Sequence, residues 1–561
     1  MSNERSLDRR DFLQGAAAGA LGVAAGAAAS GILPAYADED EEELEEEAAD
    51  EASEEEASAD ADSDAEWDYE ADFVVVGSGT ACMGAFAAAK GGASVIVIEK
   101  NSWLGGTTKL SGCVLWVPGN HVMDEFGYGP DVSDEEVVEY LRTADVTHAG
   151  EETLQLDYVE NAKTILQWMD DNFDFEMGIF PSTCDYYDLP GAMGLGRSVG
   201  FADSVVDTSE VGMDEPYGEV FEPLFDELGC QVFTDTEASS LICDDDGRVI
   251  GVQTADGLAF KADKGVLLGT GGFEHNEDMR NRYLAGPLLG ISSPEANTGD
   301  GILMARKLGA DIGNMSSIWG VPYYLTNEEG PDGNILGDYG MYVGLPGAIY
   351  VNTKGRRFVN ECAGYDVVTN AMYNYDTLSY SQGNLISYMI FDQAHVDSYG
   401  WPGFGDRPDY VAEFDSLEEL AEEYGIDEEG LLDEVERFNE MAETGVDTDY
   451  GRGSWLHDTI QCEYSGAPTD TPNCSLGAIS TPPYYAVKVG PGAFGTNGGL
   501  RTDVDSRVLD LDGEPIEGLY ACGNCTEGVF GSIYPGPGGT VGPGFYKAVR
   551  AANHALDLGI V

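Results

Sequence analysis

One segment constrains the fold of this chain more than any other. The apolar run Phe73–Val76 leads into Gly77-Ser78-Gly79, an Ala-rich stretch continues to Lys90, and a second apolar run, Val95–Ile98, ends at Glu99. A strand, a helix and a second parallel strand in this order form a βαβ unit, whose glycines let the backbone approach a pyrophosphate and whose terminal acid accepts a ribose hydroxyl. The segment therefore predicts an α/β fold and a bound dinucleotide, with Gly77, Ser78, Gly79 and Glu99 as contacts.

A second group of glycines and hydroxyl residues closely follows this acid. It comprises Leu104-Gly-Gly-Thr-Thr108 and Leu110-Ser-Gly-Cys113. Nicotinamide-binding domains do not usually carry such a patch, whereas flavoproteins with a two-dinucleotide-type fold do, so we predict that the cofactor is FAD. The further cofactor contacts that we expect are Lys100, Gly106, Thr107, Thr108, Ser111, Gly112, Ala238, Thr270, Gly271, Gly523, Asn524, Gly539 and Val541.

The first 37 residues have the features of a twin-arginine export signal. Arg9-Arg10 precedes a mildly apolar Ala/Gly run to Leu33, and small residues favour cleavage after Ala37. This route carries folded proteins, which suits a chain that acquires its cofactor in the cytoplasm. We expect a periplasmic, cell-surface or extracellular protein without stable membrane insertion. The alternative is an uncleaved anchor helix, although an Ala/Gly-rich run would anchor poorly.

Residues 38–70 contain 20 acids and no lysine or arginine. Such a segment buries too little apolar surface to offset its ordering entropy, so we expect a disordered spacer. Because residues 1–37 are balanced in charge, removing these 20 charges from the total of −76 leaves −56 for the remaining chain. A body this acidic argues against nucleic acid, whose phosphates require a basic face.

The cysteines and histidines show no spacing typical of a metal site, so no metal is expected. The one C-x-x-C sequence is Cys522-Gly-Asn-Cys525, which is followed by Thr526 rather than by the histidine of a haem attachment site. It could be a redox pair, a disulfide formed after export, or two small residues in a tight loop. We expect the six histidines to be structural or surface residues.

The composition divides the remaining chain into three parts. Residues 71–325 read as the first part of the FAD domain, with helices between Asp131 and Asp171 and strands near 231–233, 239–243 and 249–254. From about Leu325 tyrosine, glycine and proline become frequent, and residues 326–495 read as a substrate domain with a helix pair at 416–443. Dinucleotide-domain character returns in residues 496–561. A Rossmann-like FAD domain with an inserted α+β substrate domain is thus predicted, with the site where the two meet.

Several motifs identify a family. Val75-Val76-Gly77, Gly105-Gly106-Thr107 and Thr270-Gly271-Gly272-Phe273 are shared by a superfamily of FAD proteins. More discriminating motifs are Ser111–Gly119, Arg357–Glu361 followed by Tyr365, Gly498–Asp503 and Tyr534–Gly538. From Phe73 to the C-terminus the chain resembles the FAD-dependent 3-ketosteroid dehydrogenases (3-oxosteroid 1-dehydrogenase-like), within the fumarate reductase/succinate dehydrogenase flavoprotein superfamily.

The resemblance implies roles for four residues. The Tyr534 hydroxyl and the Gly538 N–H would hold the substrate's C3 carbonyl oxygen, and Tyr365 would be the base, assisted by Tyr186. Tyr187 could serve instead, because Ser182-Thr183-Cys184 lengthens the loop, whose aromatic side chains we expect to be exposed.

The chemistry accounts for these residue types. A tyrosinate, whose parent pKa is about 10, removes a proton beside a ketone only when the developing enolate is stabilised, and one oxyanion donor is typically worth ~3 kcal/mol. The hydride would then pass from C1 to flavin N5, and the same groups run backwards would reduce an enone.

Three other functions remain open at this stage. A reductase of fumarate or urocanate needs arginines to bind the acid, yet Gly528–Thr540 contains no Arg, Lys or His. An exported enone reductase of steroids or steroid-like lactones would resemble the cardiac glycoside reductase, and an extracellular flavin carrier would have no substrate. We expect an exported FAD oxidoreductase that acts on CH–CH groups of a small hydrophobic, steroid-like ketone, with an unknown external electron donor or acceptor.

Overall fold

A computed structural model describes residues 66–561 except for 174, 181–183, 202–215, 330–334, 340–343, 403–405 and 469. The predicted export signal and residues 38–65 of the predicted spacer lie outside the described residues. Strand β1 (Tyr69–Val76) takes up Tyr69 and Glu70, so the boundary predicted at residue 70 is too late. Within the described part of the chain, no helix is both long and apolar enough to cross a membrane.

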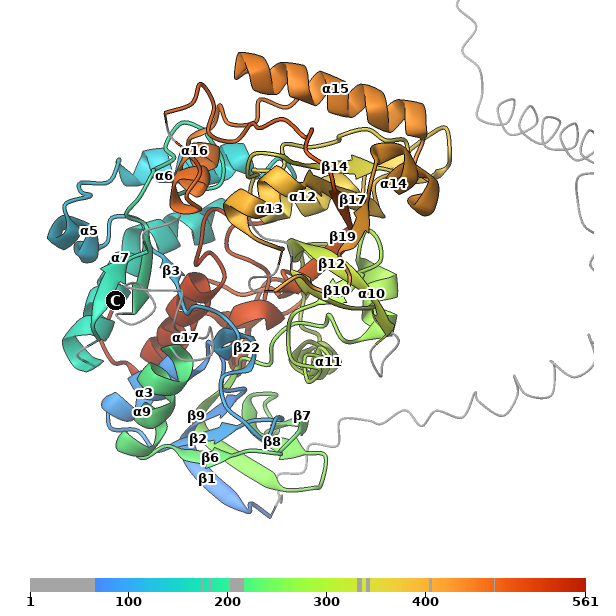
Figure 1. Ribbon diagram of the computed structural model, residues 1–561. Coiled ribbons are helices and arrows are strands. Elements are labelled where there is room, and N and C mark those ends of the chain that lie inside the picture. The colour runs from blue at the N-terminus through green and yellow to red at the C-terminus, as the bar shows by residue number, and fades with distance from the viewer. Residues whose placement is uncertain are drawn as a thin grey trace, which may run out of the picture. The chain divides into compact units, whose positions relative to one another are not determined.

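A mainly parallel sheet forms the base of the FAD domain (Figure 1). Its central strands run parallel in the order β22 (Pro515–Ala521), β9 (Ala259–Leu268), β1, β2 (Val95–Ile98) and β6 (Gln231–Phe233). Antiparallel additions are β21 (Arg507–Leu509) on β22, and β8 (Val249–Thr254) with β7 (Ala238–Cys243) on β9. The predicted α/β fold and its βαβ unit are therefore confirmed.

Both faces of this sheet are covered, which explains why its strands are continuously apolar. Val75 and Val97 belong to the core formed with α3 (Cys82–Lys90) and α17 (Val541–Leu556). Val74 and Ile96 belong to the opposite core, which includes residues of α11 (Asp300–Lys307). Figure 1 shows α3 and α17 together beside the strands.

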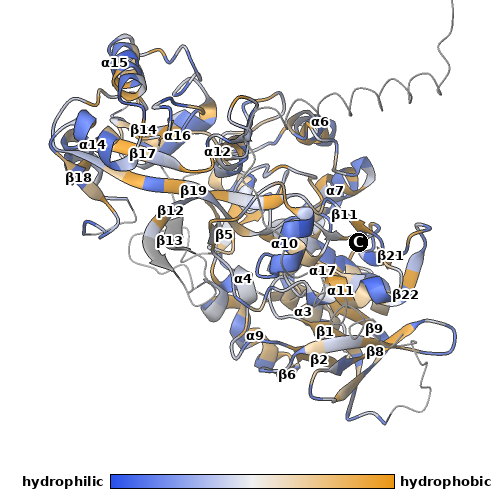
Figure 2. Cartoon of the chain, turned by 90° about the vertical axis from the view of Figure 1, so that its right-hand side faces the viewer, coloured by the Kyte–Doolittle hydropathy of each residue, from blue (hydrophilic) through white to orange (hydrophobic). Residues whose placement is uncertain are grey.

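The inserted region is built on a second, antiparallel sheet. Its order is β13 (Ile335–Tyr339), β12 (Ile318–Glu329), β19 (Tyr484–Thr496), β17 (Ser387–Asp392) and β14 (Ala348–Asn352), while β10 (Gly290–Ile291) and β18 (Ala412–Phe414) also pair with β19. Helices α14 (Leu417–Tyr424) and α15 (Glu428–Thr444) pack on one face, and α12 (Tyr365–Met372) and α13 (Gln393–Tyr399) on the other. Figure 2 shows the outward hydrophilic surface of α14. Strand β12 starts before the boundary predicted at residue 326.

Further helices and short strands complete the structure. Helices α6 (Asp134–Ala144) and α7 (Glu152–Phe173) pack together near a small sheet of β3 (Leu115–Trp116), β5 (Ser198–Phe201) and β4 (Met177–Ile179). The remaining elements are α4 (Gly106–Lys109), α5 (His121–Phe126), η1 (Tyr217–Phe221), α9 (Glu222–Glu227), α10 (Glu277–Tyr283), β11 (Ile312–Gly313), β15 (Tyr375–Asp376), β16 (Ser381–Gln382), α16 (Leu456–Tyr464), β20 (Gly499–Leu500) and η2 (Gly523–Cys525).

A fully buried charge network fixes the segment that leads into α12. The Glu361 carboxylate accepts two hydrogen bonds of 2.7 Å from Arg357 and one of 3.1 Å from Arg452. Arg357 also donates to Asp447 at 2.9 Å, and Arg452 donates to the backbone carbonyls of Ala348 and Leu345. Two arginines thus face two carboxylates, and the network joins residues 345–361 to the loop at 447–452.

We expect Glu361→Gln to lower the free energy of unfolding by ~3 kcal/mol or more, because the change leaves two buried guanidinium groups with one carboxylate. Urea unfolding of the FAD-loaded protein measures this loss. Asp278→Asn is the control, since it breaks an exposed pair with Arg282 at 3.0 Å and should cost less than ~1 kcal/mol. Equal effects of the two substitutions would contradict a structural role for the buried network.

Candidate functional site

A cavity of about 1390 Å³ lies between the two sheets. One end is lined by residues that directly follow the parallel strands: Val76–Thr80 after β1, Ile98–Asn101 after β2 and Gly269–Gly271 after β9. Ligands of open parallel sheets bind at this carboxyl edge. The other end is lined by residues of β12, α12 and α16. Because typical single-ligand pockets measure ~300–1,000 Å³, this cavity can hold a cofactor and a second molecule.

The cofactor end fits FAD. Gly77 has φ of +98°, and a side chain there would place Cβ 2.2 Å from the carbonyl oxygen of Gly269, so the close turn requires glycine. The Ser78 N–H and hydroxyl donate to Glu99, at 3.0 and 2.6 Å, which fixes the acid at the end of β2. The buried Thr270 hydroxyl, which lines the cavity, has no hydrogen-bond partner among the described residues.

Most of the predicted cofactor contacts line this cavity. The exceptions are Gly523 and Gly539, which line a smaller cavity next to it. The predicted contacts on the main cavity wall are Gly77, Ser78, Gly79, Glu99, Lys100, Gly106, Thr107, Thr108, Ser111, Gly112, Ala238, Thr270, Gly271, Asn524 and Val541. Their individual roles stay predictions, because the structure shows position and not contact with FAD.

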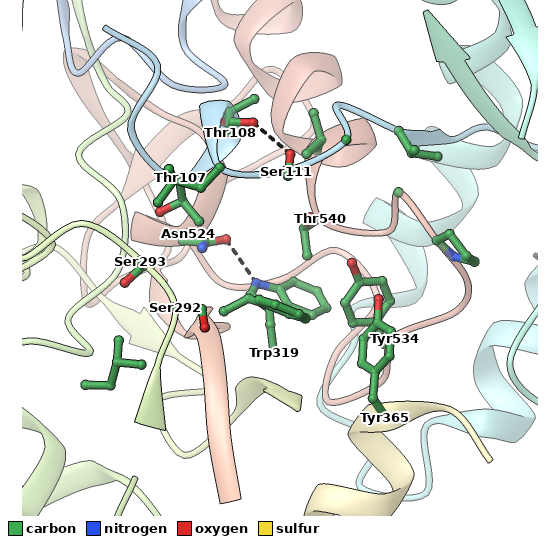
Figure 3. A pocket seen from close by; sticks show the side chains of 18 of the residues that line it. Thr107, Thr108, Ser111, Ser292, Ser293, Trp319, Tyr365, Asn524, Tyr534 and Thr540 are labelled. Carbon is green, nitrogen blue, oxygen red and sulfur yellow. Dashed lines mark hydrogen bonds between the residues drawn. The ribbon is translucent and has the colours of Figure 1, made fainter. Parts of the chain in front are cut away.

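Three tyrosines from distant parts of the chain meet at the other end. The ring centroids of Tyr365 and Tyr534 are 5.2 Å apart, and Tyr186 lies 5.1 Å from Tyr365 and 5.5 Å from Tyr534. All three line the cavity. Figure 3 shows Tyr365 and Tyr534 close together, beside the Trp319 ring. The structure thus brings together the tyrosines that the resemblance assigned to catalysis.

Burial controls the protonation of this group. Desolvation raises the pKa of Tyr365 well above 10, and the neighbouring Tyr186 and Tyr534 raise it further. Burial also raises the pKa of Tyr534, although its hydrogen bonds with Tyr365 and Thr540 oppose the shift. Tyr365 is therefore a neutral phenol near pH 7, and only its minor tyrosinate form can accept a proton.

The segment after Tyr534 is held rigidly and leaves one donor available. Tyr140 donates to the Pro535 carbonyl at 2.7 Å and Ser198 to the Pro537 carbonyl at 2.9 Å, while Trp116 N–H donates to the Gly538 carbonyl at 3.1 Å. In the described part of the chain the Gly538 N–H has no acceptor, and Gly538 lines the cavity. Its φ of +91° favours glycine.

Of the two neighbouring tyrosines in the long loop, only Tyr186 lines the cavity. Its backbone N–H donates to the Pro535 carbonyl at 3.1 Å, which ties the loop to the Tyr534 segment. The Tyr187 hydroxyl instead donates to Asp366 at 2.6 Å. The expectation that these aromatics are exposed is wrong, because Tyr186 is 7% exposed and Tyr187 is partly buried.

Asp366 is a residue of this site that the sequence reasoning missed. It follows Tyr365 directly, is 3% exposed, and its Oδ2 accepts from the Tyr187 hydroxyl and, at 3.3 Å, from the Tyr534 N–H. Its Oδ1 has no partner among the described residues. Burial raises the pKa of the carboxyl group to about 6. Its position inside the Tyr365 motif was the one signal that pointed to it.

Two further residues at the site were not singled out from the sequence. Trp319 on β12 donates to the Asn524 side chain at 2.9 Å and packs on Tyr534 at 5.1 Å (Figure 3). His457 lies 5.1 Å from the Tyr186 ring, and its Nδ1 donates to the Cys362 carbonyl at 2.9 Å. Burial lowers the pKa of His457 to about 4, so the imidazole is neutral. Neither residue belongs to a local motif.

The two cysteines of the C-x-x-C sequence are free thiols. Both are buried, and burial raises the pKa of each, which suppresses thiolate reactivity. The Cys525 thiol donates to the carbonyl of Leu268 at 3.4 Å and of Cys522 at 3.2 Å. This geometry favours the tight-loop interpretation over the redox pair. No cluster of His, Cys, Asp or Glu in the described residues could hold a metal ion.

The cavity lacks charge that could bind an acid. Among the described residues that line it, Lys100 is the only lysine or arginine, and it lies at the cofactor end, paired with Asp300 and Glu237 at 3.0 Å. The internal segments outside the described residues contain no lysine or arginine in their sequence. The tyrosine end is therefore suited to a neutral ligand.

Comparison with known proteins places this architecture in context. A model of the family described as "FAD binding domain" matches residues 72–541. The chain is 35% identical over 525 residues to the 4-oxocyclohexanecarboxylate 2-dehydrogenase of Sinomonas cyclohexanicum, covering 84% of this chain and 90% of that one. It is 34% identical over 581 residues to the 3-oxosteroid 1-dehydrogenase of Mycolicibacterium smegmatis, covering 87% and 97%.

A solved structure agrees with these relatives. The 3-ketosteroid delta1-dehydrogenase from Sterolibacterium denitrificans, in complex with 1,4-androstadiene-3,17-dione, is similar with a TM-score of 0.76 and 31% identity, covering 87% of this chain and 99% of that one. Reductases are also among the relatives, at 29% and 30% identity. These comparisons confirm the predicted FAD cofactor and fold class, and the resemblance on which the tyrosine assignment rests.

We expect Asp366→Asn to stabilise the protein above pH 6. A folded-state pKa of about 6, against 3.8 unfolded, means that ionisation costs stability as the pH rises through this range. The full cost is about 3 kcal/mol as an upper bound. Asparagine can still accept the bonds from Tyr187 and Tyr534, so the advantage of the variant should grow between pH 5 and 7.5.

Urea unfolding of the FAD-loaded protein at the two pH values measures this difference. Asp145→Asn is a control of opposite sign, because hydrogen bonds from Gly150, Thr147 and Ser532 lower the pKa of Asp145 despite its burial. That variant should lose stability by the same amount at pH 5 and pH 7.5, because both values lie above the ordinary carboxyl pKa and Asp145 is ionised in the folded and the unfolded state. A pH-independent effect of Asp366→Asn would show that the carboxyl group does not titrate in this range.

Proposed function

Since this chain belongs to the FAD binding domain family and is an FAD-dependent oxidoreductase acting on CH–CH groups, we propose that it interconverts a ketone and its α,β-unsaturated ketone on a neutral, polycyclic, steroid-like substrate. The observation that carries this proposal is the group formed by Tyr365, Tyr534 and Tyr186 beside the unpaired Gly538 N–H. Two donors and a proton-carrying phenol are what chemistry at the carbon beside a carbonyl requires.

The proposed mechanism assigns one task to each of these groups. The Tyr534 hydroxyl and the Gly538 N–H donate to the carbonyl oxygen and stabilise the enolate that develops there, each worth ~3 kcal/mol by analogy with other oxyanion holes. Tyr365 acts in its tyrosinate form, which a hydrogen bond from Tyr186 stabilises; it removes the proton from the carbon beside the carbonyl and becomes a neutral phenol. When bound, FAD supplies the two-electron acceptor or donor for the next carbon. The aromatic walls exclude water from the reacting atoms.

The nature of the cavity wall supports a neutral, bulky substrate. A small unsaturated diacid would need arginine or lysine at the tyrosine end, and none of the described residues supplies one there. The same absence argues against a monocyclic keto acid, the kind of compound named for one relative. A cavity larger than FAD alone requires, with Trp319, Phe494 and Trp401 among its lining residues, suits apolar rings.

A specific observation also favours the reverse reaction as a second candidate. Because burial keeps Tyr365 protonated, it is ready to donate a proton to the carbon beside the carbonyl of an enone. Reduction then needs an external electron donor, and oxidation an external acceptor. We leave the partner unassigned and propose that its potential sets the direction.

Anaerobic mixing of the FAD-loaded protein with androstenedione tests the proposal. Bleaching of the flavin absorbance with loss of two hydrogens from the steroid is expected for a dehydrogenase. Reoxidation of dithionite-reduced flavin by a 4-ene or 1,4-diene ketone is expected for the reductase. Reoxidation by fumarate or urocanate, with no response to any ketone, would overturn the steroid proposal and leave the FAD enzyme.

Tyr365→Phe should retain FAD and lose turnover by ~10²–10⁴-fold, because the phenol that carries the proton is gone. Tyr373→Phe is the matched control: it follows α12, lies outside the cavity lining and donates only to the Pro287 carbonyl at 3.0 Å. We expect its turnover to equal that of the native protein. Full activity of Tyr365→Phe would remove this residue from the mechanism.

We also propose that the protein is exported by the twin-arginine route, on the sequence evidence of Arg9-Arg10 and the Ala/Gly run. Changing both arginines to lysine should retain the protein in the cytoplasm with its FAD bound. Cell fractionation followed by immunodetection measures the distribution. An unchanged distribution would show that another signal, or none, determines where the protein resides.

A further inference from the structure

A small second cavity shares part of its wall with the main cavity. It measures about 20 Å³ and shares three wall residues with the main cavity: Trp319, Asn524 and Thr540. Gly523 and Gly539, both predicted to contact FAD, also line it. These shared residues therefore form the wall between the small cavity and the main cavity.

A buried lysine forms part of its wall. Lys547, on the second turn of α17, is 4% exposed. Its ammonium group donates to the Thr526 hydroxyl and to the Glu527 carbonyl, each at 3.1 Å. An ammonium has three N–H donors, and no acceptor among the described residues takes the third. Because Lys547 lines the small cavity, this donor is available to a molecule inside it.

An unpaired acceptor lines the same cavity. Asn497 is 1% exposed, its Nδ2 donates to the Gly531 carbonyl at 2.8 Å, and its Oδ1 has no partner among the described residues. The bond to Gly531 fixes the orientation of the amide. A cavity needs ~10–15 Å³ to hold one water. The cavity therefore has room and hydrogen-bonding groups for a single water between Lys547 and Asn497.

The charges that face Lys547 come from several elements. Glu527, next to it, is 3.5 Å from Arg501, which also pairs with Glu151 ahead of α7 and with Asp311. Cys522 and Cys525, at η2, are neutral because burial raises the pKa of both thiols. Desolvation lowers the pKa of Lys547 to about 8 against the opposing effect of Glu527. The lysine is thus charged near pH 7, and no carboxylate of the described residues bonds to it.

We propose that Lys547 is a buried cation that stabilises the reduced, negatively charged form of the bound FAD. Deprotonation of Lys547 then makes the reduction potential of the cofactor fall more steeply with rising pH in the alkaline range. Two electrons and one proton entering FAD leave one negative charge on the reduced ring. A unit charge behind the wall of the cofactor cavity acts on that ring more strongly than it would in water, because the effective dielectric constant of the buried surroundings is low. The electrons come from the substrate or from the external partner, so the inference holds for either reaction direction and any substrate.

Lys547→Met tests the proposal, because methionine keeps much of the length of the side chain and removes the charge. The readout is the midpoint potential of the FAD-loaded full-length protein, measured by equilibration with redox dyes from pH 6.5 to 10. Below pH 8 the equilibrium constant for reduction of FAD should be about tenfold lower in the variant than in the native protein. This corresponds to a midpoint potential that is ~30 mV lower for a two-electron couple. Above pH 9 the native and variant curves should converge.

Lys261→Met is the matched control. It removes the same charge from a half-exposed position on β9 that lines neither cavity. Its curve should coincide with that of the native protein. Coincidence of the Lys547→Met and native curves over the whole pH range would overturn the proposal, as would an equal shift in both variants.

Glu527→Gln keeps the proposal testable if Lys547→Met does not bind FAD. Removing this carboxylate takes away an interaction that raises the pKa of Lys547, so the alkaline change in slope should move to lower pH. A change in slope at the native pH would overturn the proposal. Neither measurement uses the organic substrate, so failure of the proposed function leaves this test unaffected.

Discussion

The geometry of the site depends on one carboxylate, that of Glu361. Its side chain lies between Arg357 and Arg452 with no exposure to solvent. The two guanidinium groups also bind Asp447 and the carbonyls of Leu345 and Ala348, just before and at the start of β14. Burying four charges costs free energy unless each is paired, so a displacement that separates any one of these side chains from its partner is unfavourable. Because α12 begins four residues after Glu361, the network also fixes where Tyr365 lies. A structural ion cluster in the inserted region thereby positions a side chain that must meet Tyr534 from the FAD domain.

The packing of Tyr365 against Tyr534 bears on how the proposed mechanism uses phenols, which are weak acids, at neutral pH. Burial makes each phenol harder to ionise, which by itself would prevent Tyr365 from acting as a base. The same water-free surroundings strengthen every hydrogen bond to a developing enolate. The rigid segment from Tyr534 to Gly538 has its carbonyls occupied by Tyr140, Ser198 and Trp116, so its free N–H is held in place. In the proposed reaction, loss of the proton beside the carbonyl is thus coupled to stabilisation of the charge that develops on the carbonyl oxygen.

The sequence predicted the parts of this structure that local patterns determine. The βαβ unit follows from apolar periodicity and glycine position, and Tyr365 and Tyr534 could be selected because they lie in contiguous motifs. The burial of Tyr186 could not be predicted, since it depends on a backbone bond to Pro535, distant in the sequence. Trp319 likewise reaches Tyr534 through the pairing of β12 with β19, and His457 through the docking of α16. Contacts of this kind are set by tertiary packing, and one sequence holds no local signal for them.

The outer surface and the tyrosine end of the cavity differ in their charge. The chain after the acidic N-terminal segment carries a net charge of −56, yet no unpaired cation among the described residues lies at the tyrosine end of the cavity. A surface of this sign repels anions, while it does little to the neutral ketone that we propose as the substrate. Entry of the substrate then depends on burial of apolar surface, worth ~25 cal/mol per Å². Among the described residues, Lys100 lines the main cavity and is neutralised by carboxylates, whereas Lys547 lines the small cavity and no carboxylate bonds to it.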